Sequence, residues 1–85
     1  MKKIMIIGLL ITDRIKESGR TQKVLSQYAH IIRARLGFHE VSEDVCSRVG
    51  VILLQLAGRK EEWDNLVAAL EAIGGVEVRT MNFEI

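Results

Sequence analysis

The chain has 85 residues, a length at which one hydrophobic core leaves no room for a second, so we expect a single domain over residues 1–85. It carries 12 Lys and Arg residues and 11 Asp and Glu residues, and the resulting net charge of +1 argues against direct binding to nucleic acid or to an anionic membrane. The single cysteine, Cys46, excludes an internal disulfide.

The N-terminal segment begins with a basic stretch and continues as the apolar run from Ile4 to Ile11. This arrangement imitates a signal peptide, but the run passes into Thr12, Asp13 and Arg14 without a small-residue cleavage site. It is also far too short to cross a bilayer. We therefore expect a cytoplasmic protein, and we assign residues 3–12 to a first β-strand because they are apolar and β-branched.

A polar segment over residues 13–19 follows this strand and is expected to form a loop. From Thr21 onward, apolar side chains recur at helical spacing, which predicts a first helix that ends near Ile32. Ser18 and Thr21 are the candidate N-cap residues, because their hydroxyl oxygens can accept from the first free N–H groups of such a helix.

The second half of the chain predicts a hairpin, a helix and a final strand. Residues 31–38 alternate between apolar and polar side chains, as a half-exposed strand does, and a polar loop over residues 39–47 leads to an apolar strand over residues 48–57. A second helix over residues 61–73 opens with two acidic side chains and ends at a pair of glycines. Alternation resumes over residues 76–83, which predicts a fourth strand.

The predicted order is β-α-β-β-α-β, which indicates an α+β, ferredoxin-like fold. The first and third strands are apolar on both faces and the second and fourth alternate, so we expect an antiparallel sheet in the order 4-1-3-2 with two helices on one face. The other face is then apolar and uncovered. A second copy of the chain is the simplest cover, and we expect a homo-oligomer, a dimer or a tetramer.

Several features together resemble one known family. They are the run from Lys3 to Gly8, Arg14, the stretch from Tyr28 to Gly37, and the two glycines Gly58 and Gly75 that flank the second helix. With this order of elements, the chain resembles the small iron-only hydrogenase system regulators. These are ACT-like proteins similar to the regulatory domain of the nickel-responsive repressor. The resemblance implies an oligomeric regulator that binds a small effector or a protein partner, with hydrogenase-maturation proteins as candidate partners.

ACT-like domains bind small effectors where the first β-to-α loop meets a neighbouring subunit. The resemblance implies that Thr12, Asp13, Arg14 and Gly19 form this site. Independently of the resemblance, the loop leads to the N-terminal end of the first helix, whose free N–H groups favour an anion. The guanidinium of Arg14 suits a carboxylate or a phosphate. The alternative is that the charged side chains of this segment are simply solvated.

Arg33 and Arg35 lie on one side of the second predicted strand. Paired arginines at this spacing can hold an acidic ligand or a neighbouring subunit. Arginines on an outer strand also discourage sheet-to-sheet aggregation, and both interpretations stay open.

His39 and Cys46 are the strongest candidate metal ligands, with His30 as a third, since imidazole and thiolate suit zinc, nickel or copper. The nickel-responsive repressor uses a His-x-His pair ahead of its cysteine, whereas Gly37 occupies the position two before His39 here. We therefore predict no bound cofactor, and we keep a metal-sensing module that uses His39 and Cys46 as an alternative function.

Catalysis is not predicted. The sequence has no phosphate-binding glycine loop and no carboxylate pair in an apolar segment, and a Cys46–His39 dyad would lack an orienting third group. Small dimeric ferredoxin-like proteins include enzymes, so a small enzyme of this kind is the second alternative to the regulatory function.

Overall fold

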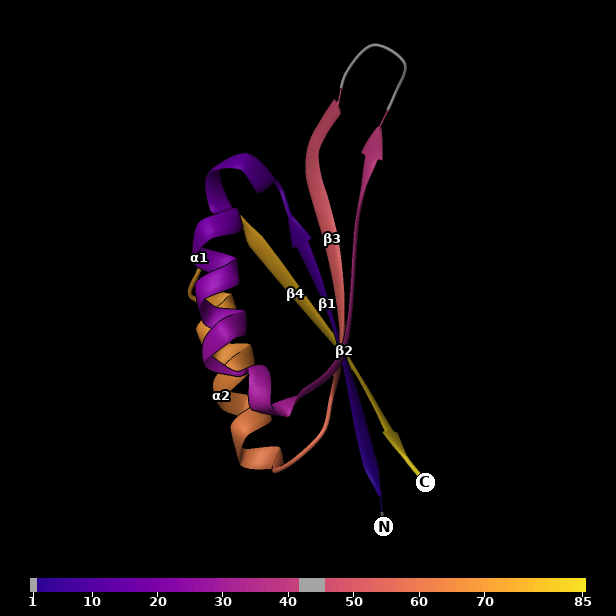
Figure 1. Cartoon of the computed structure of the whole chain (residues 1–85). Helices are drawn as coiled ribbons and strands as arrows, with labels where there is room; N and C mark the ends of the chain where they lie inside the picture. Colours follow the sequence, from indigo (N-terminus) through magenta and orange to yellow (C-terminus); the bar gives the residue numbers. More distant parts are fainter. Residues whose placement is uncertain (1, 42–45) are drawn as a thin grey trace.

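A computed structural model of the chain describes residues 2–41 and 46–85, and for residues 14, 15, 38–41 and 46–48 it describes the backbone alone (Figure 1). The described residues form four strands, two helices and one short 3₁₀ turn. In chain order these are β1 (Lys3–Ile11), α1 (Arg14–Gln27), η1 (Ala29–Ile31), β2 (Ile32–Val41), β3 (Cys46–Leu56), α2 (Lys60–Glu71) and β4 (Val76–Glu84).

The four strands form one sheet in the order β2-β3-β1-β4, and all neighbouring strands are antiparallel. Both helices lie on the same face of this sheet (Figure 1). The predicted ferredoxin-like βαββαβ fold and its strand order are therefore confirmed. No helix in the described part of the chain is long and apolar enough to cross a membrane.

The hydrophobic core lies between the sheet and the two helices. The odd-numbered residues of β1 from Met5 to Ile11 point into it, as do Leu54 and Leu56 of β3. α2 contributes three buried residues that recur at helical spacing, namely Trp63, Leu66 and Leu70. The indole Nε1 of Trp63 donates to the carbonyl oxygen of Ala57 at 2.8 Å, so the buried ring also holds the turn that precedes α2.

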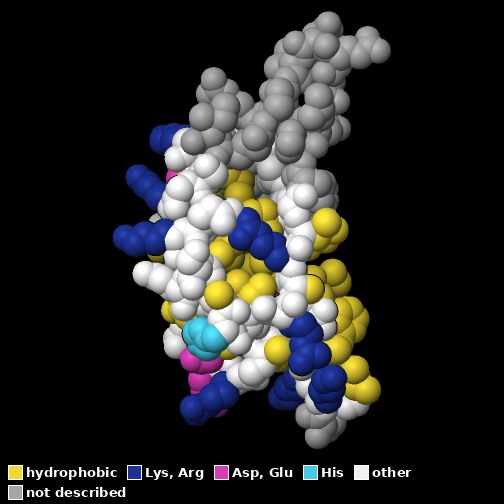
Figure 2. Space-filling model, viewed as in Figure 1, with side chains coloured by type: hydrophobic (Ala, Val, Ile, Leu, Met, Phe, Trp, Pro, Cys, Tyr) yellow, Lys and Arg dark blue, Asp and Glu magenta, His cyan; other side chains and the backbone are white. Residues whose placement is uncertain are grey.

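The opposite face of the sheet, called the open face below, has no helix over it among the described residues (Figure 1). Figure 2 shows hydrophobic side chains gathered along the side of the sheet that points away from the helices. Register and alternation place these described residues on it: Ile4, Ile6, Gly8, Leu10, Ala34, Leu36, Val49, Val51, Leu53, Gln55, Glu77, Arg79, Met81 and Phe83. The prediction that both faces of the central strands are apolar is confirmed.

The start of α1 differs from the prediction. The segment from residue 13 to residue 19 is the first part of the helix and not a loop, and its N-cap is Asp13 rather than Ser18 or Thr21. The inward-facing positions of these first turns are Glu17 and Thr21, which are buried although they are polar. Hydrophobic spacing therefore becomes visible in the sequence only after the helix has already begun.

The hairpin between β2 and β3 is also longer than predicted. β2 continues to Val41 and β3 begins at Cys46, so the predicted loop over residues 39–47 is wrong at both ends. Val41 pairs with Cys46 in the ladder. The polar side chains that suggested a loop do not prevent this pairing, because backbone hydrogen bonding between strands does not require apolar side chains. Figure 1 shows that the two strands extend well beyond the helices.

Glycines with a positive φ terminate β3 and begin β4. Gly58, at φ +83°, makes the turn from β3 toward α2, and Gly75, at φ +80°, makes the turn from α2 into β4. Both angles lie in the left-handed region that side chains with a Cβ rarely adopt. α2 ends at Glu71 with Ala72 as its C-cap, before the predicted end at residue 73, so Gly75 makes the turn into β4 and does not cap the helix.

Candidate functional site

The predicted effector segment lies at the N-terminal end of α1, where the protein's own side chains already satisfy several polar groups. Both the backbone N–H and the hydroxyl of Thr12 donate to the carbonyl oxygen of Gly75, each at 3.0 Å. The carboxylate of Asp13 accepts from the backbone N–H of Lys16 at 3.2 Å and so caps the helix. An incoming anion would have to compete with this carboxylate for the same positive end of the helix.

The other two residues of the predicted effector site, Arg14 and Gly19, both lie within α1. Arg14 is the first residue of α1, and its backbone alone is described. Gly19 lies within α1 on its exposed side, and a Cβ built at this position meets nothing within 4 Å. The structure brings Thr12 and Asp13 together but places Gly19 along the helix, so the assignment of these four residues to an effector site stays a prediction.

The two arginines of β2, Arg33 and Arg35, have different surroundings. The register of β2 on β3 shifts between Ile32 and Ala34, so Arg33 lies in a bulge. Arg35 follows in regular pairing, and its Nη1 donates to the side-chain oxygen of Gln22 on α1 at 2.9 Å. Arg35 therefore links the outer strand to a helix, whereas Arg33 lines a pocket at the end of the sheet.

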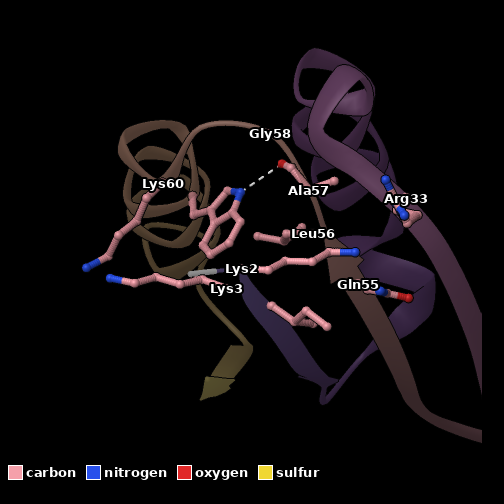
Figure 3. Close-up of a pocket in the computed structure, with 10 residues that line it drawn as sticks. Lys2, Lys3, Arg33, Gln55, Leu56, Ala57, Gly58 and Lys60 are labelled. Atoms are coloured by element: carbon pink, nitrogen blue, oxygen red, sulfur yellow. Dashed lines mark hydrogen bonds between the residues drawn. The ribbon is translucent and has the colours of Figure 1, made fainter. Parts of the chain in front are cut away.

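This pocket, called the basic pocket below, has a volume of about 350 Å³. Its charged lining residues are Lys2, Lys3, Arg33 and Lys60, and it is also lined by Trp63, by the last two residues of β3, Gln55 and Leu56, and by Ala57 and Gly58 of the turn that follows. Figure 3 shows Lys60 and Arg33 on opposite sides, with Lys2 and Lys3 between them. The four cations come from three separate parts of the chain: the start of β1, the bulge of β2 and the first residue of α2.

No carboxylate lines the basic pocket among the described residues. Lys3 forms an ion pair with Glu84 at 3.7 Å, and both side chains are about half exposed. In the described part of the chain, no ion pair is formed by Lys2, Arg33 or Lys60. Among the described residues, these positive charges therefore share one concave surface, with the Glu84 carboxylate as the one counter-charge that pairs with them.

His30 lies far from the other two candidate metal ligands, His39 and Cys46, which belong to the hairpin of β2 and β3. His30 lies in η1, before the start of β2, and its Nε2 lies 3.1 Å from the Glu62 carboxylate. His39 lies seven residues along β2 from its first residue, which at about 3.3 Å per residue is about 23 Å away. His30 therefore cannot share a metal ion with His39. The side chains of His39 and Cys46 lie outside the described ones, and a site formed by these two stays a prediction.

Among the residues with described side chains, no group of three His, Cys, Asp or Glu side chains is arranged to hold a metal ion. Glu17 is the one buried carboxylate found there, and its Oε2 lies 3.8 Å from Arg20 Nη1 without a hydrogen-bond partner. It packs against Gly75, because a Cβ at Gly75 would lie 3.4 Å from Glu17 Cγ. This carboxylate is part of the packing between α1 and the start of β4.

The basic pocket is not visible in the sequence, although Arg33 is one of the residues predicted to hold an acidic ligand. Lys2 and Lys3 look like an ordinary basic N-terminal stretch, and Lys60 looks like a solvated residue before the second helix. One local signal was available. Arg59 and Lys60 place two cations at the positive end of the dipole of the second helix, ahead of the acidic Glu61 and Glu62 of its first turn.

Comparison with solved structures supports the fold. A Thermotoga maritima structure of the uncharacterized protein TM1266 shares 25% identity over 98% of this chain and 100% of that chain, with a TM-score of 0.81. The de novo designed protein Foldit4 covers 99% of both chains at 16% identity and a TM-score of 0.58. The LarC2 domain of a cyclometallase that takes part in synthesis of the NPN cofactor of lactate racemase covers 99% of this chain and 58% of that chain. Its identity is 14% and its TM-score is 0.51. At these identities, Foldit4 and LarC2 show the fold alone.

No curated protein matches the chain in sequence. A family model does match it, over residues 3–80, and its description is "TM1266-like: Iron-only hydrogenase system regulator, putative". The match extends from the first residue of β1 into β4, and it confirms the family indicated by the sequence features above. The chain belongs to the TM1266-like family of iron-only hydrogenase system regulators.

Proposed function

We propose that this protein is a non-catalytic regulator that works as a homodimer, with two copies packed through the open faces of their sheets. The observation that carries the proposal is the large apolar surface left on the open face. Leu36, Met81 and Phe83 are 59%, 57% and 52% exposed in the single chain. Contiguous apolar surface of this kind usually marks an interface.

The middle of the open face is shaped to receive side chains from a partner. Gly8 lies at its centre, paired with Leu53 on one side and Arg79 on the other. A hollow of about 220 Å³ lies over this glycine and is lined also by Leu10 and Val51. A second shallow hollow, of about 210 Å³, lies between Ile6 and Leu36. Projecting side chains such as Met81 could fill these hollows in a second copy.

The charges of the open face favour a second copy over a different partner. Glu77 and Arg79 lie two residues apart on β4 and form an ion pair at the margin of this face. A surface that carries one acid and one base is complementary to itself under two-fold symmetry, because each can pair with the other on the partner. An acidic or a basic partner protein would match only one of them.

The size of the open face is sufficient for a moderate interface. It spans four strands, and about eight residues in each strand at spacings of about 4.8 Å and 3.3 Å correspond to about 500 Å². Two copies would together bury about 1,000 Å², which is at the lower end for specific association. We therefore expect a dimer that forms at micromolar concentration and dissociates on dilution.

The regulatory part of the proposal is supported by the family description. We infer that the dimer responds to a small effector or acts on a partner protein, and hydrogenase-maturation proteins are the first candidates to test. The assembly is tested first, because both roles depend on it.

Sedimentation velocity at micromolar concentration tests the dimer directly. We expect the wild-type protein to sediment as a dimer and Leu53→Lys to sediment as a monomer, because the new charge would be buried at the centre of the interface. Met81→Lys is a second variant at a more exposed position of the same face. Asn65→Lys is the matched control, since it adds the same charge at an exposed position of α2.

A wild-type monomer across the micromolar range would overturn the proposal. So would equal dissociation of Leu53→Lys and Asn65→Lys, because the charge would then act without regard to the face that carries it. Circular dichroism of all variants checks that each retains its fold.

A further inference from the structure

We infer that the basic pocket binds a small oxyanion with two or more negative charges, and that this ligand is the effector of the regulator. The inference rests on the proposed function only in calling the ligand an effector. Binding itself depends on the pocket of a single subunit and can be measured whether or not the dimer forms.

The charge of the basic pocket favours an anionic ligand. Lys2, Lys3, Arg33 and Lys60 line it together, and the carboxylate of Glu84 pairs with Lys3 at its margin. Like charges that share a concave surface repel one another more strongly than charges that are fully solvated. A surface built only for solubility would intersperse acids among these cations. A bound polyanion removes the repulsion and supplies the missing counter-charge.

The N-terminus of α2 borders the pocket at Gly58 and Lys60 and also favours an anion. This helix has 12 residues, and its N-cap residue Arg59 makes no side-chain hydrogen bond to the free N–H groups. The first helical residue, Lys60, adds a cation at the positive end of the dipole. Glu61 and Glu62 in the first turn offset part of this charge, but they are engaged with Arg59 at 3.8 Å and His30 at 3.1 Å.

The shape and donors of the pocket suit a small ligand. A volume of about 350 Å³ lies within the range of small-molecule sites. Gly58 leaves one wall without a side chain, and Gln55 adds an amide donor to the charged donors of the lysines and the arginine. The guanidinium of Arg33 can hold two oxygens of one phosphate or carboxylate group. These features recognise oxygens arranged around a compact, highly charged centre.

The location of the pocket connects it to the proposed interface. Ile4 and Gln55 line the pocket and also belong to the open face by register. A ligand that orders the pocket would therefore order one end of the proposed dimer surface. Nucleic acid fits less well, because the cations are confined to one corner of a chain whose net charge is only +1.

Isothermal titration calorimetry of the full chain at low ionic strength tests the inference, with pyrophosphate and citrate as probes. Pyrophosphate represents phosphate-bearing ligands, and citrate represents carboxylates. We expect at least one probe to bind once per subunit. Arg33→Gln and Lys60→Gln should each weaken binding about tenfold, because each removes a charge-assisted contact. Lys23→Gln is the matched control, since it removes the same charge from the exposed surface of α1.

Each result of these titrations either supports or overturns the inference. Tighter binding of one probe than of the other identifies the source of the oxyanion and supports the inference. Failure of both probes to bind at about 1 mM would overturn it, as would equal weakening by Lys60→Gln and Lys23→Gln. Binding only to a single-stranded oligonucleotide would also overturn it. A repeat with the Leu53→Lys variant shows whether a failure belongs to the pocket or to the dimer.

Discussion

The two helices of this domain begin in opposite ways, although each follows a central strand of the sheet. α1 follows β1, and its N-terminus is closed by the protein itself, because the Asp13 carboxylate accepts from the Lys16 N–H at 3.2 Å. α2 follows β3 and begins with Arg59 and Lys60, with no side-chain cap. Figure 1 shows that these two N-termini lie at opposite ends of the sheet.

This difference indicates where an external anion can act. At α1, the negative charge that a helix N-terminus favours is built into the chain. At α2, cations from three parts of the chain surround the N-terminus, and the favoured negative charge is missing from the pocket beside it. We therefore expect that changes at the α1 end alter stability, whereas changes at the α2 end alter ligand binding.

Gly75→Ala tests the packing of the chain around the N-terminus of α1, and it should have the largest effect on stability. The substitution forces alanine to adopt φ +80°, which residues with a Cβ rarely do, and the new Cβ would lie 3.3 Å from Thr12 Oγ1. We expect a loss of about 2 kcal/mol in the free energy of unfolding, measured by urea denaturation. Gly74→Ala is the control, because a Cβ there meets nothing within 4 Å. Similar losses in both variants would show that Gly75 is not specially required.

Asp13→Ala tests the cap of α1 and should have a smaller effect. It removes both the hydrogen bond to Lys16 and a negative charge at the positive end of the dipole, and we expect a loss of about 1.5 kcal/mol. Ser18→Ala serves as the control inside the helix, where no loss is expected. Binding of pyrophosphate should be the same in both variants. A larger loss in Ser18→Ala would mean that the helix begins later than the structure shows.

Arg59→Ser tests the N-terminus of α2, which has no side-chain cap, and it should have the smallest effect on stability. Serine at the N-cap position can accept from the free N–H groups of α2, so we expect Arg59→Ser to be more stable than Arg59→Ala by about 1 kcal/mol. Both variants remove the same charge, which isolates the cap. The serine variant should also bind pyrophosphate more weakly than the alanine variant. Equal affinity would contradict a role for the helix N-terminus in the basic pocket.

Much of the fold was predictable because the hydrophobic pattern repeats locally. Alternation and helical spacing predicted the order of elements, and the apolar character of both faces of β1 predicted its central position. The start of α1 was missed because its buried positions Glu17 and Thr21 are polar. The Thr21 hydroxyl is satisfied within the helix, since it donates to the backbone carbonyl oxygen of Glu17 at 3.0 Å.

The sequence by itself determined the fold class, the strand order and the presence of an apolar face without a helix, because each follows from periodicity within single elements. Only the tertiary structure decided which side chains meet. The bulge at Arg33, the antiparallel register of β1 on β3 and the turn at Gly58 together bring Arg33, Lys2 and Lys60 to one pocket. These residues lie far apart along the chain, and the contact between them depends on strand register and backbone angles, which a hydrophobic pattern does not encode.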